Sequence, residues 1–126
     1  FGRGWPSGEI TVSDMVAIYN RSRINLGFAM VLDTEDTFCL KGRDFEVPMA
    51  GGLYFTQYHE ALNDVYAVGK EIVCFHDIVD MIEKIRYYLG HPDDAQRIRK
   101  RGYERARRDH TWRKRFETAF NAVNIL

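Results

Sequence analysis

The chain has 126 residues, of which 45% are hydrophobic, 13% aromatic and 29% charged, and its formal net charge is zero. This length suits one domain and excludes two large ones, and the apolar content can form a hydrophobic core, which excludes a disordered chain. The longest nearly apolar stretch, residues 24–32, is far shorter than the roughly 20 residues that cross a bilayer, and no basic-then-apolar leader opens the chain, so we expect neither a membrane span nor secretion.

The first elements along the chain are a strand end and a helix. Phe1–Gly8 starts with a large apolar residue and is rich in glycine, which is typical of a strand end followed by a loop. We therefore expect a piece of a longer protein, with part of the sheet upstream. Residues 13–22 predict a helix with Ser13 as its N-cap. One side of that helix carries Met15, Val16, Ile18 and Tyr19.

Three short runs predict strands that are covered on both faces. The runs are residues 24–29, 53–56 and 71–75, and they are apolar, β-branched or aromatic without sustained polar alternation. Helical patterns follow the last of them. Residues 77–89 have apolar residues at three-four spacing with Asp77 as the cap, residues 93–109 form the next helix, and Thr111 caps a last one. The last helix is expected to have one apolar face made of Trp112, Phe116, Ala119, Phe120 and Val123, and its aromatic stripe is expected to be either core or a contact with another domain of a longer protein.

Strands that alternate with helices predict an α/β fold. Repeated β-α units have right-handed crossovers and produce a parallel sheet. We therefore expect a single Rossmann-like domain over residues 1–126, with three to four parallel strands, helices on both faces and a C-terminal helical segment.

An anion site is predicted before the second strand, because ligands of open parallel sheets bind at the carboxyl ends of the strands. Pro48 fits a short helix near its first turn, so the helix is expected to begin near Asp44 or Phe45 and to end at Gly51–Gly52. Its free N–H groups, beside Lys41 and Arg43, suit a diphosphate. Glu46 can accept hydrogen bonds from sugar or ribose hydroxyls. The alternative is an ordinary solvated helix start with local ion pairs worth under about 1 kcal/mol.

Three segments together resemble the C-terminal domain of group 1 glycosyltransferases, and more narrowly their spore-maturation-protein-like branch. The segments are residues 41–52, residues 69–73, and His110-Thr111-Trp112 with Arg115. The resemblance implies the GT-B fold, in which this chain is the later part of the domain that binds a nucleotide-sugar donor. It also implies a retaining transfer that requires an N-terminal acceptor domain of the same protein, and no bound metal or other cofactor.

The same resemblance assigns residues to the donor. Glu46 matches the family glutamate that contacts the ribose, while Arg43 and Lys41 lie where the branch has basic residues and are expected near the diphosphate. The chain departs from the broader family at Phe38, where a first glutamate is expected. The donor-binding set that we expect is Lys41, Gly42, Arg43, Phe45, Glu46, Gly51, Thr56 and Tyr58.

Other polar residues are predicted to be structural. His59 is expected to be a surface or capping residue and His76 a strand-end residue, and no His or carboxylate cluster has the spacing of a metal site. Cys39 and Cys74 are expected to be reduced core thiols, which favours a cytoplasmic protein.

The charge is unevenly distributed. Residues 1–96 carry 8 Lys and Arg against 15 Asp and Glu, whereas residues 97–115 carry 10 against 2. Three interpretations of the basic segment are open: a helix on the sheet with its cations in water and a stripe of Ile98, Tyr103 and Ala106, a peripheral contact with an anionic membrane, or a nucleic-acid contact, which we rank last. A noncatalytic interaction module that uses this helix is therefore the alternative to a transferase.

Overall fold

Three short parallel strands lie at the centre of the protein, in a computed structural model that describes residues 10–34 and 37–124. The strands are β1 (Asn25–Gly27), β2 (Tyr54–Gln57) and β3 (Val73–Phe75). They lie in the order β1-β2-β3, and Phe55 pairs with Leu26 on one side and with Val73 on the other. The predicted parallel sheet is confirmed. The expectation for residues 1–8 lies outside the described residues.

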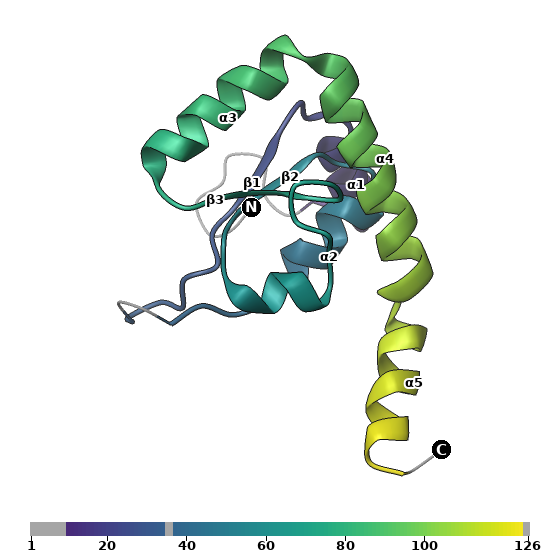
Figure 1. Cartoon of the computed structure of the whole chain (residues 1–126). Coiled ribbons are helices and arrows are strands. Elements are labelled where there is room, and N and C mark those ends of the chain that lie inside the picture. Colours follow the sequence, from purple (N-terminus) through teal and green to yellow (C-terminus); the bar gives the residue numbers. More distant parts are fainter. Residues whose placement is uncertain (1–9, 35–36, 125–126) are drawn as a thin grey trace.

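Helices cover both faces of the sheet. The described helices are α1 (Val12–Arg21), α2 (Gly42–Met49), the 3-10 helix η1 (Glu60–Asp64), α3 (Ile78–Gly90), α4 (Pro92–Asp109) and α5 (Trp112–Ala122). Figure 1 shows α3 on one side of the strands and α2 on the other, and α4 contacts both of these helices. The Rossmann-like α/β architecture is therefore confirmed. Among the described helices, none combines the length and apolar character needed to cross a membrane.

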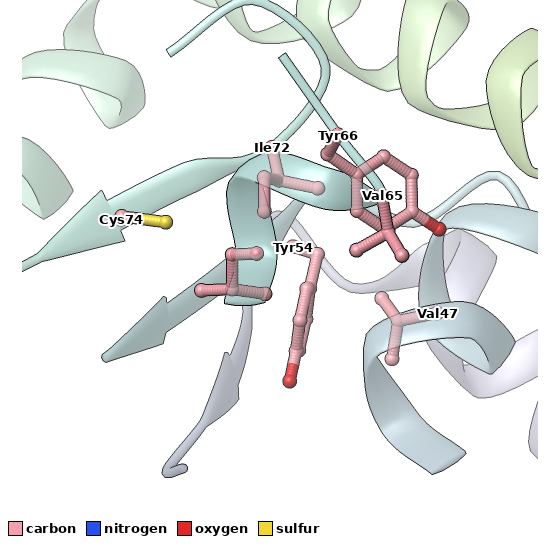
Figure 2. Close-up of a cluster of buried hydrophobic side chains, with 7 residues drawn as sticks. Val47, Tyr54, Val65, Tyr66, Ile72 and Cys74 are labelled. Carbon is pink, nitrogen blue, oxygen red and sulfur yellow. The ribbon is translucent and has the colours of Figure 1, made fainter. Parts of the chain in front are cut away.

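Each face of the sheet buries its own apolar cluster, because successive side chains of a strand point to opposite faces. On the α2 face, Tyr54 of β2 packs with Val47 of α2 and with Ile72 (Figure 2). On the α3 face, Phe55 and Phe75 pack with Ile98 of α4. The central strand β2 therefore contributes side chains to both apolar clusters.

Helix α2 begins earlier than predicted and carries its proline near its end. It starts at Gly42 because Oδ2 of the Asp44 carboxylate accepts a hydrogen bond from the Lys41 N–H at 2.6 Å and closes the first turn. A proline in a helix interior costs about 3 kcal/mol, because it lacks the N–H that bonds to the carbonyl four residues before it and its ring clashes with that carbonyl. Pro48 is the seventh of eight helical residues, so it lacks the helical bond to the Asp44 carbonyl. Its side chain is buried beside α4, where a β-carbon on Gly102 would lie 3.7 Å from it.

The N-cap of α1 also differs from the prediction. Thr11, rather than Ser13, caps the helix, and its Oγ1 accepts from the Asp14 N–H at 3.1 Å. The same hydroxyl donates to the Asp14 carboxylate at 2.7 Å, which ties the two side chains together. In α3 the predicted cap is confirmed, since the Asp77 carboxylate accepts from the N–H groups of Val79 and Asp80.

Helix α4 lies on the core through a stripe that differs from the predicted one at a single position. Ile98 and Ala106 are buried as expected, but the third member is Gly102 and not Tyr103, whose exposed fraction is 38%. Gly102 occupies the contact because the helix axis comes close to the Glu71 carbonyl, where only a residue without a side chain fits.

The aromatic face of α5 is exposed, so the expectation that it belongs to the core is wrong, while the alternative of a contact with another domain stays a prediction. Trp112, Phe116 and Phe120 have exposed fractions of 76%, 51% and 40%, and their rings stack one above another along the helix. Figure 1 shows α5 continuing beyond α4, clear of the sheet. The sequence pattern identified an amphipathic helix correctly, but in the described part of the chain no element covers its apolar face.

The two cysteines occupy different environments. Cys74 of β3 is buried as predicted, whereas Cys39 is exposed and is therefore not a core thiol, and both are free. Cys39 lies in the connection between β1 and α2, which runs over the surface. Burial raises the pKa of the Cys74 thiol to about 12, so this thiol stays protonated at neutral pH.

We expect one fast and one slow thiol in the folded protein. At about pH 8, Ellman's reagent should react promptly with Cys39 and reach Cys74 only on unfolding, because the thiolate is the reactive form. Cys39→Ser should abolish the fast phase and Cys74→Ser the slow one. Two thiols that react promptly in the native protein would contradict the burial of Cys74.

Candidate functional site

The amino end of α2 lies at the carboxyl edge of the sheet. Since β1 and β2 are parallel neighbours, the helix that connects them must run in the opposite direction. The Lys41 ammonium supports this placement, because it donates to the Met30 carbonyl, shortly after the end of β1, at 2.7 Å. The predicted position of this helix end is confirmed.

A buried carboxylate already occupies the inner side of this helix end. Asp44 is 2% exposed, and while its Oδ2 accepts from the Lys41 N–H, its Oδ1 accepts from the Tyr54 hydroxyl at 2.7 Å. Burial, and then the Asp44 charge, raise the pKa of Tyr54 well above its ordinary value, so the hydroxyl remains a donor. The expectation of free N–H groups therefore needs correction: the Lys41 N–H is not available to a ligand, and the Asp44 N–H already donates to the Lys41 carbonyl at 3.0 Å.

The outer side of α2 borders a pocket of about 300 Å³, which we call the Glu46 pocket. One wall comes from the start and outer face of α2, and the other from the junction between α4 and α5. The α2 wall consists of Leu40, Lys41, Gly42, Phe45, Glu46 and Met49. The other wall consists of His110, Trp112 and Arg115. Two segments far apart in the sequence, residues 40–49 and 110–115, thus form one site.

Charged groups of both signs lie around this pocket. Glu46 is exposed, and its carboxylate folds back toward the helix start, where a β-carbon on Gly42 would lie 3.2 Å from Oε1. The Arg115 guanidinium lies over the Phe45 ring, 4.3 Å from its centroid, in a cation–π contact. A ligand with hydroxyl groups and a negative charge would therefore meet an acceptor at Glu46 and cations at Lys41 and Arg115.

His110 fixes the position of the second wall. Its imidazole is 8% exposed, and Nε2 lies 2.8 Å from the Val65 carbonyl, which only accepts, so Nε2 carries a proton. The ring also makes edge contacts with Phe45 and Tyr66, at centroid distances of 5.3 and 5.0 Å. His110 therefore holds the α4–α5 junction against α2 and places Trp112 and Arg115 at the pocket.

Four residues of the predicted donor-binding set lie outside the Glu46 pocket. Arg43 is exposed on α2, and Gly51, with a positive φ of 78°, lies at the opposite end of that helix. Thr56 is fully buried, with no partner for its hydroxyl among the described residues. The Tyr58 hydroxyl accepts from the Asn63 side chain at 2.9 Å. The other four members, Lys41, Gly42, Phe45 and Glu46, line the pocket together.

Two further histidines, His59 and His76, lie near the same edge of the sheet. His59 is the N-cap residue of η1, as predicted, but it is buried rather than on the surface, and it stacks on Phe38 with ring centroids 6.4 Å apart. His76 directly follows β3, as predicted, with its ring centroid 4.9 Å from that of Tyr58. Within residues 10–34 and 37–124, no group of three or more His, Cys, Asp or Glu is placed to hold a metal ion.

Sequence reasoning did not include Trp112 and Arg115 among the site residues. In the sequence, their segment is one of three motifs that occur together in the chain. Nothing in local periodicity connects residues 110–115 with residues 41–46. The co-occurrence of the two motifs was the one signal that could have joined them.

Comparison with known proteins gives one match. A family described as glycosyl transferase-like matches residues 1–121, which is nearly the whole chain and includes both walls of the Glu46 pocket. Searches of curated proteins and of solved structures gave no match. The narrower branch suggested by the sequence motifs stays a prediction.

Proposed function

Because the chain belongs to the glycosyl transferase-like family, we propose that it is the nucleotide-sugar-binding part of a GT-B glycosyltransferase of the hexosyl type and that the donor binds in the Glu46 pocket. The observation that carries this proposal is the convergence of residues 41–46 and 110–115 on one pocket at the carboxyl edge of a parallel sheet. Ligands of open α/β sheets bind at this edge.

The pocket offers a separate contact for each part of such a donor. The Glu46 carboxylate would accept hydrogen bonds from the ribose hydroxyls. Lys41 and Arg115 would face the diphosphate, and their charge would offset the negative charge that develops on the leaving group as the glycosidic bond breaks. The exposed Trp112 ring provides a surface on which a nucleobase can stack.

Transfer would require a second domain that binds the acceptor. The exposed aromatic face of α5 supports this part of the proposal, because a contiguous apolar surface often marks an interaction site. No metal or other cofactor is part of the proposed mechanism. Two unpaired cysteines favour the cytoplasm as the compartment.

A nucleotide titration tests the proposal. Uridine or guanosine diphosphate should shift the amide signals of residues 41–46 and 110–115 of the full chain. Glu46→Ala should weaken the nucleotide affinity at least about tenfold, since a hydrogen bond to a charged group contributes about 1.5–3 kcal/mol. Glu83→Ala is the matched control, because Glu83 is an exposed glutamate of α3 that does not line the pocket.

Two outcomes would contradict the proposal. An unchanged affinity of Glu46→Ala would mean that Glu46 is a surface residue without a role in binding. Amide shifts with duplex DNA, and none with either nucleotide, would favour the noncatalytic interaction module instead.

A further inference from the structure

A second pocket lies at the opposite end of α2, where α1, α2 and α4 meet. Its volume is about 540 Å³, which is within the range of small-molecule sites, and we call it the Lys100 pocket. It is lined by Asn20 of α1, by Met49–Gly51 at the end of α2, and by one face of α4. The linings of this pocket and of the Glu46 pocket share Met49 and no other residue, so the two pockets are neighbours with otherwise different walls.

The α4 face of the Lys100 pocket is built by helical spacing. Gln96, Lys100, Tyr103 and Arg107 follow one another at intervals of three or four residues, which places them on one side of the helix. Two of these four side chains are cationic, and a third cation, Arg99, borders the same pocket. Val16 and Met49 add apolar surface.

Arg99 forms a rigid wall of this pocket. Its Nε donates to the Gly51 carbonyl at 2.9 Å, and an Nη group donates to the Asn20 carbonyl at 2.7 Å. Both carbonyls lie at helix carboxyl ends, where a cation is favoured by the helix dipole. An arginine has five N–H groups, and these two bonds use two of them. Arg99 can therefore donate further hydrogen bonds without moving.

Acidic side chains of α4 pair with cations on its other faces and leave the positive charge of the Lys100 pocket largely unneutralised. Arg97 pairs with Asp94, while Arg105 and Arg108 both pair with Asp109. No carboxylate in the described part of the chain lines the Lys100 pocket.

The other two cations of the pocket, Lys100 and Arg107, have weak partners. The Lys100 ammonium has only a distant partner, Glu104 at 3.9 Å, in a pair whose side chains are 73% and 57% exposed. The contacts of Arg107 among the described residues are the hydroxyl and the ring of Tyr103. Lys100 and Arg107 can therefore turn to a ligand at little cost.

We propose that the Lys100 pocket is a binding site for a phosphate group carried by a small molecule or by a lipid headgroup. Arg99 presents fixed donors, and Lys100 and Arg107 close on the phosphate from the next turns of α4. A guanidinium group matches the geometry of a phosphate and can donate two parallel hydrogen bonds to its oxygens. Met49 and the Tyr103 ring contact the part of the ligand that carries the phosphate.

Binding of pyrophosphate to the full chain tests this site. The amides of residues 49–51 and 96–107 are expected to shift on titration. Lys100→Gln and Arg107→Gln should each weaken this binding at least fivefold. Arg101→Gln removes the same charge from an exposed position of α4 outside the pocket, and it should leave the affinity unchanged. All three variants should unfold at the midpoint of the original protein.

Two results would overturn the proposal. If Arg101→Gln weakens binding as much as the other two variants, the general field of the basic helix attracts the anion. If pyrophosphate shifts only residues 41–46 and 110–115, the anion binds in the Glu46 pocket alone. If pyrophosphate instead shifts residues 49–51 and 96–107 but not residues 41–46 and 110–115, the result would count against the proposed function and not against this site.

Vesicles and DNA separate the sources of the phosphate. The protein is sedimented with phosphatidylglycerol vesicles and with pure phosphatidylcholine vesicles. If it sediments only with the former, and if Lys100→Gln and Arg107→Gln reduce this sedimentation, the site binds a lipid headgroup. Tight pyrophosphate binding without sedimentation would assign it to a soluble ligand. Binding to duplex DNA that depends on Arg101 as much as on Lys100 would overturn the proposal.

Discussion

Replacing Asp44 with alanine is expected to lower the free energy of unfolding by about 3 kcal/mol, because it leaves two buried or half-buried donors without a partner at a cost of about 1–3 kcal/mol each. The donors are the Tyr54 hydroxyl and the Lys41 N–H, which lie 2.7 and 2.6 Å from the two carboxylate oxygens. The loss should appear in urea denaturation as a lower midpoint with an unchanged slope.

Two further variants distinguish the loss of the Asp44 hydrogen bonds from a general effect of removing a negative charge. Asp14→Ala also removes an aspartate from a first helical turn, but Asp14 is exposed, and we expect a loss below about 1 kcal/mol. Tyr54→Phe removes the hydroxyl, so alanine at position 44 should cost less in that background. If the two substitutions were additive, the Asp44–Tyr54 hydrogen bond would not contribute to stability.

The second large effect is expected from Gly102→Ala in α4. In an exposed helix this change stabilises by about 1 kcal/mol, since alanine is the better helix former. At Gly102, however, a β-carbon would lie 2.3 Å from the Glu71 carbonyl oxygen, which is backbone and has no rotamer to change. Overpacking costs about 1–3 kcal/mol or more, so we expect a net loss of about 2 kcal/mol, measured by thermal or urea unfolding.

Gly90→Ala provides the control for this prediction. Gly90 is the last residue of α3, and a β-carbon there would meet nothing within 4 Å. Stability should stay the same or rise by up to about 1 kcal/mol. An equal gain from Gly102→Ala would show that α4 can move away from the segment before β3, and that the close approach is not essential to the fold.

Several features of the fold were predictable because they depend on neighbours along the chain. The strands β1 and β3 lie inside the apolar runs that predicted them, and β2 extends one residue beyond its run, to Gln57. Asp77 and Thr111 cap the helices that follow them. A cap acts on an N–H group two or three residues away, so the necessary information is local. The incorrectly predicted starts of α1 and α2 also have local causes, because Thr11 and Asp44 close the first turns of these helices at earlier residues than predicted.

The amphipathic pattern of a helix does not say what covers its apolar side. The stripes of α3 and α5 have the same spacing, yet Met81 and Ile85 of α3 pack on the sheet whereas Trp112 and Phe116 of α5 are exposed. Periodicity shows that residues share a face. Burial depends on whether another element lies against that face, and this is decided by the path of the whole chain.

By itself the sequence determined the α/β class, the parallel direction of the strands, and a helix that presents Lys41 and Glu46 at the carboxyl edge of the sheet. These features follow from hydrophobic period, capping and crossover handedness, which act over short stretches or by general rule. Only the tertiary structure brought Arg115 to Glu46, buried Asp44 against Tyr54, and left Lys100 and Arg107 without strong acidic partners around a pocket. Each of these depends on groups from separate elements meeting in space, and the relative position of such elements is set by packing around the core.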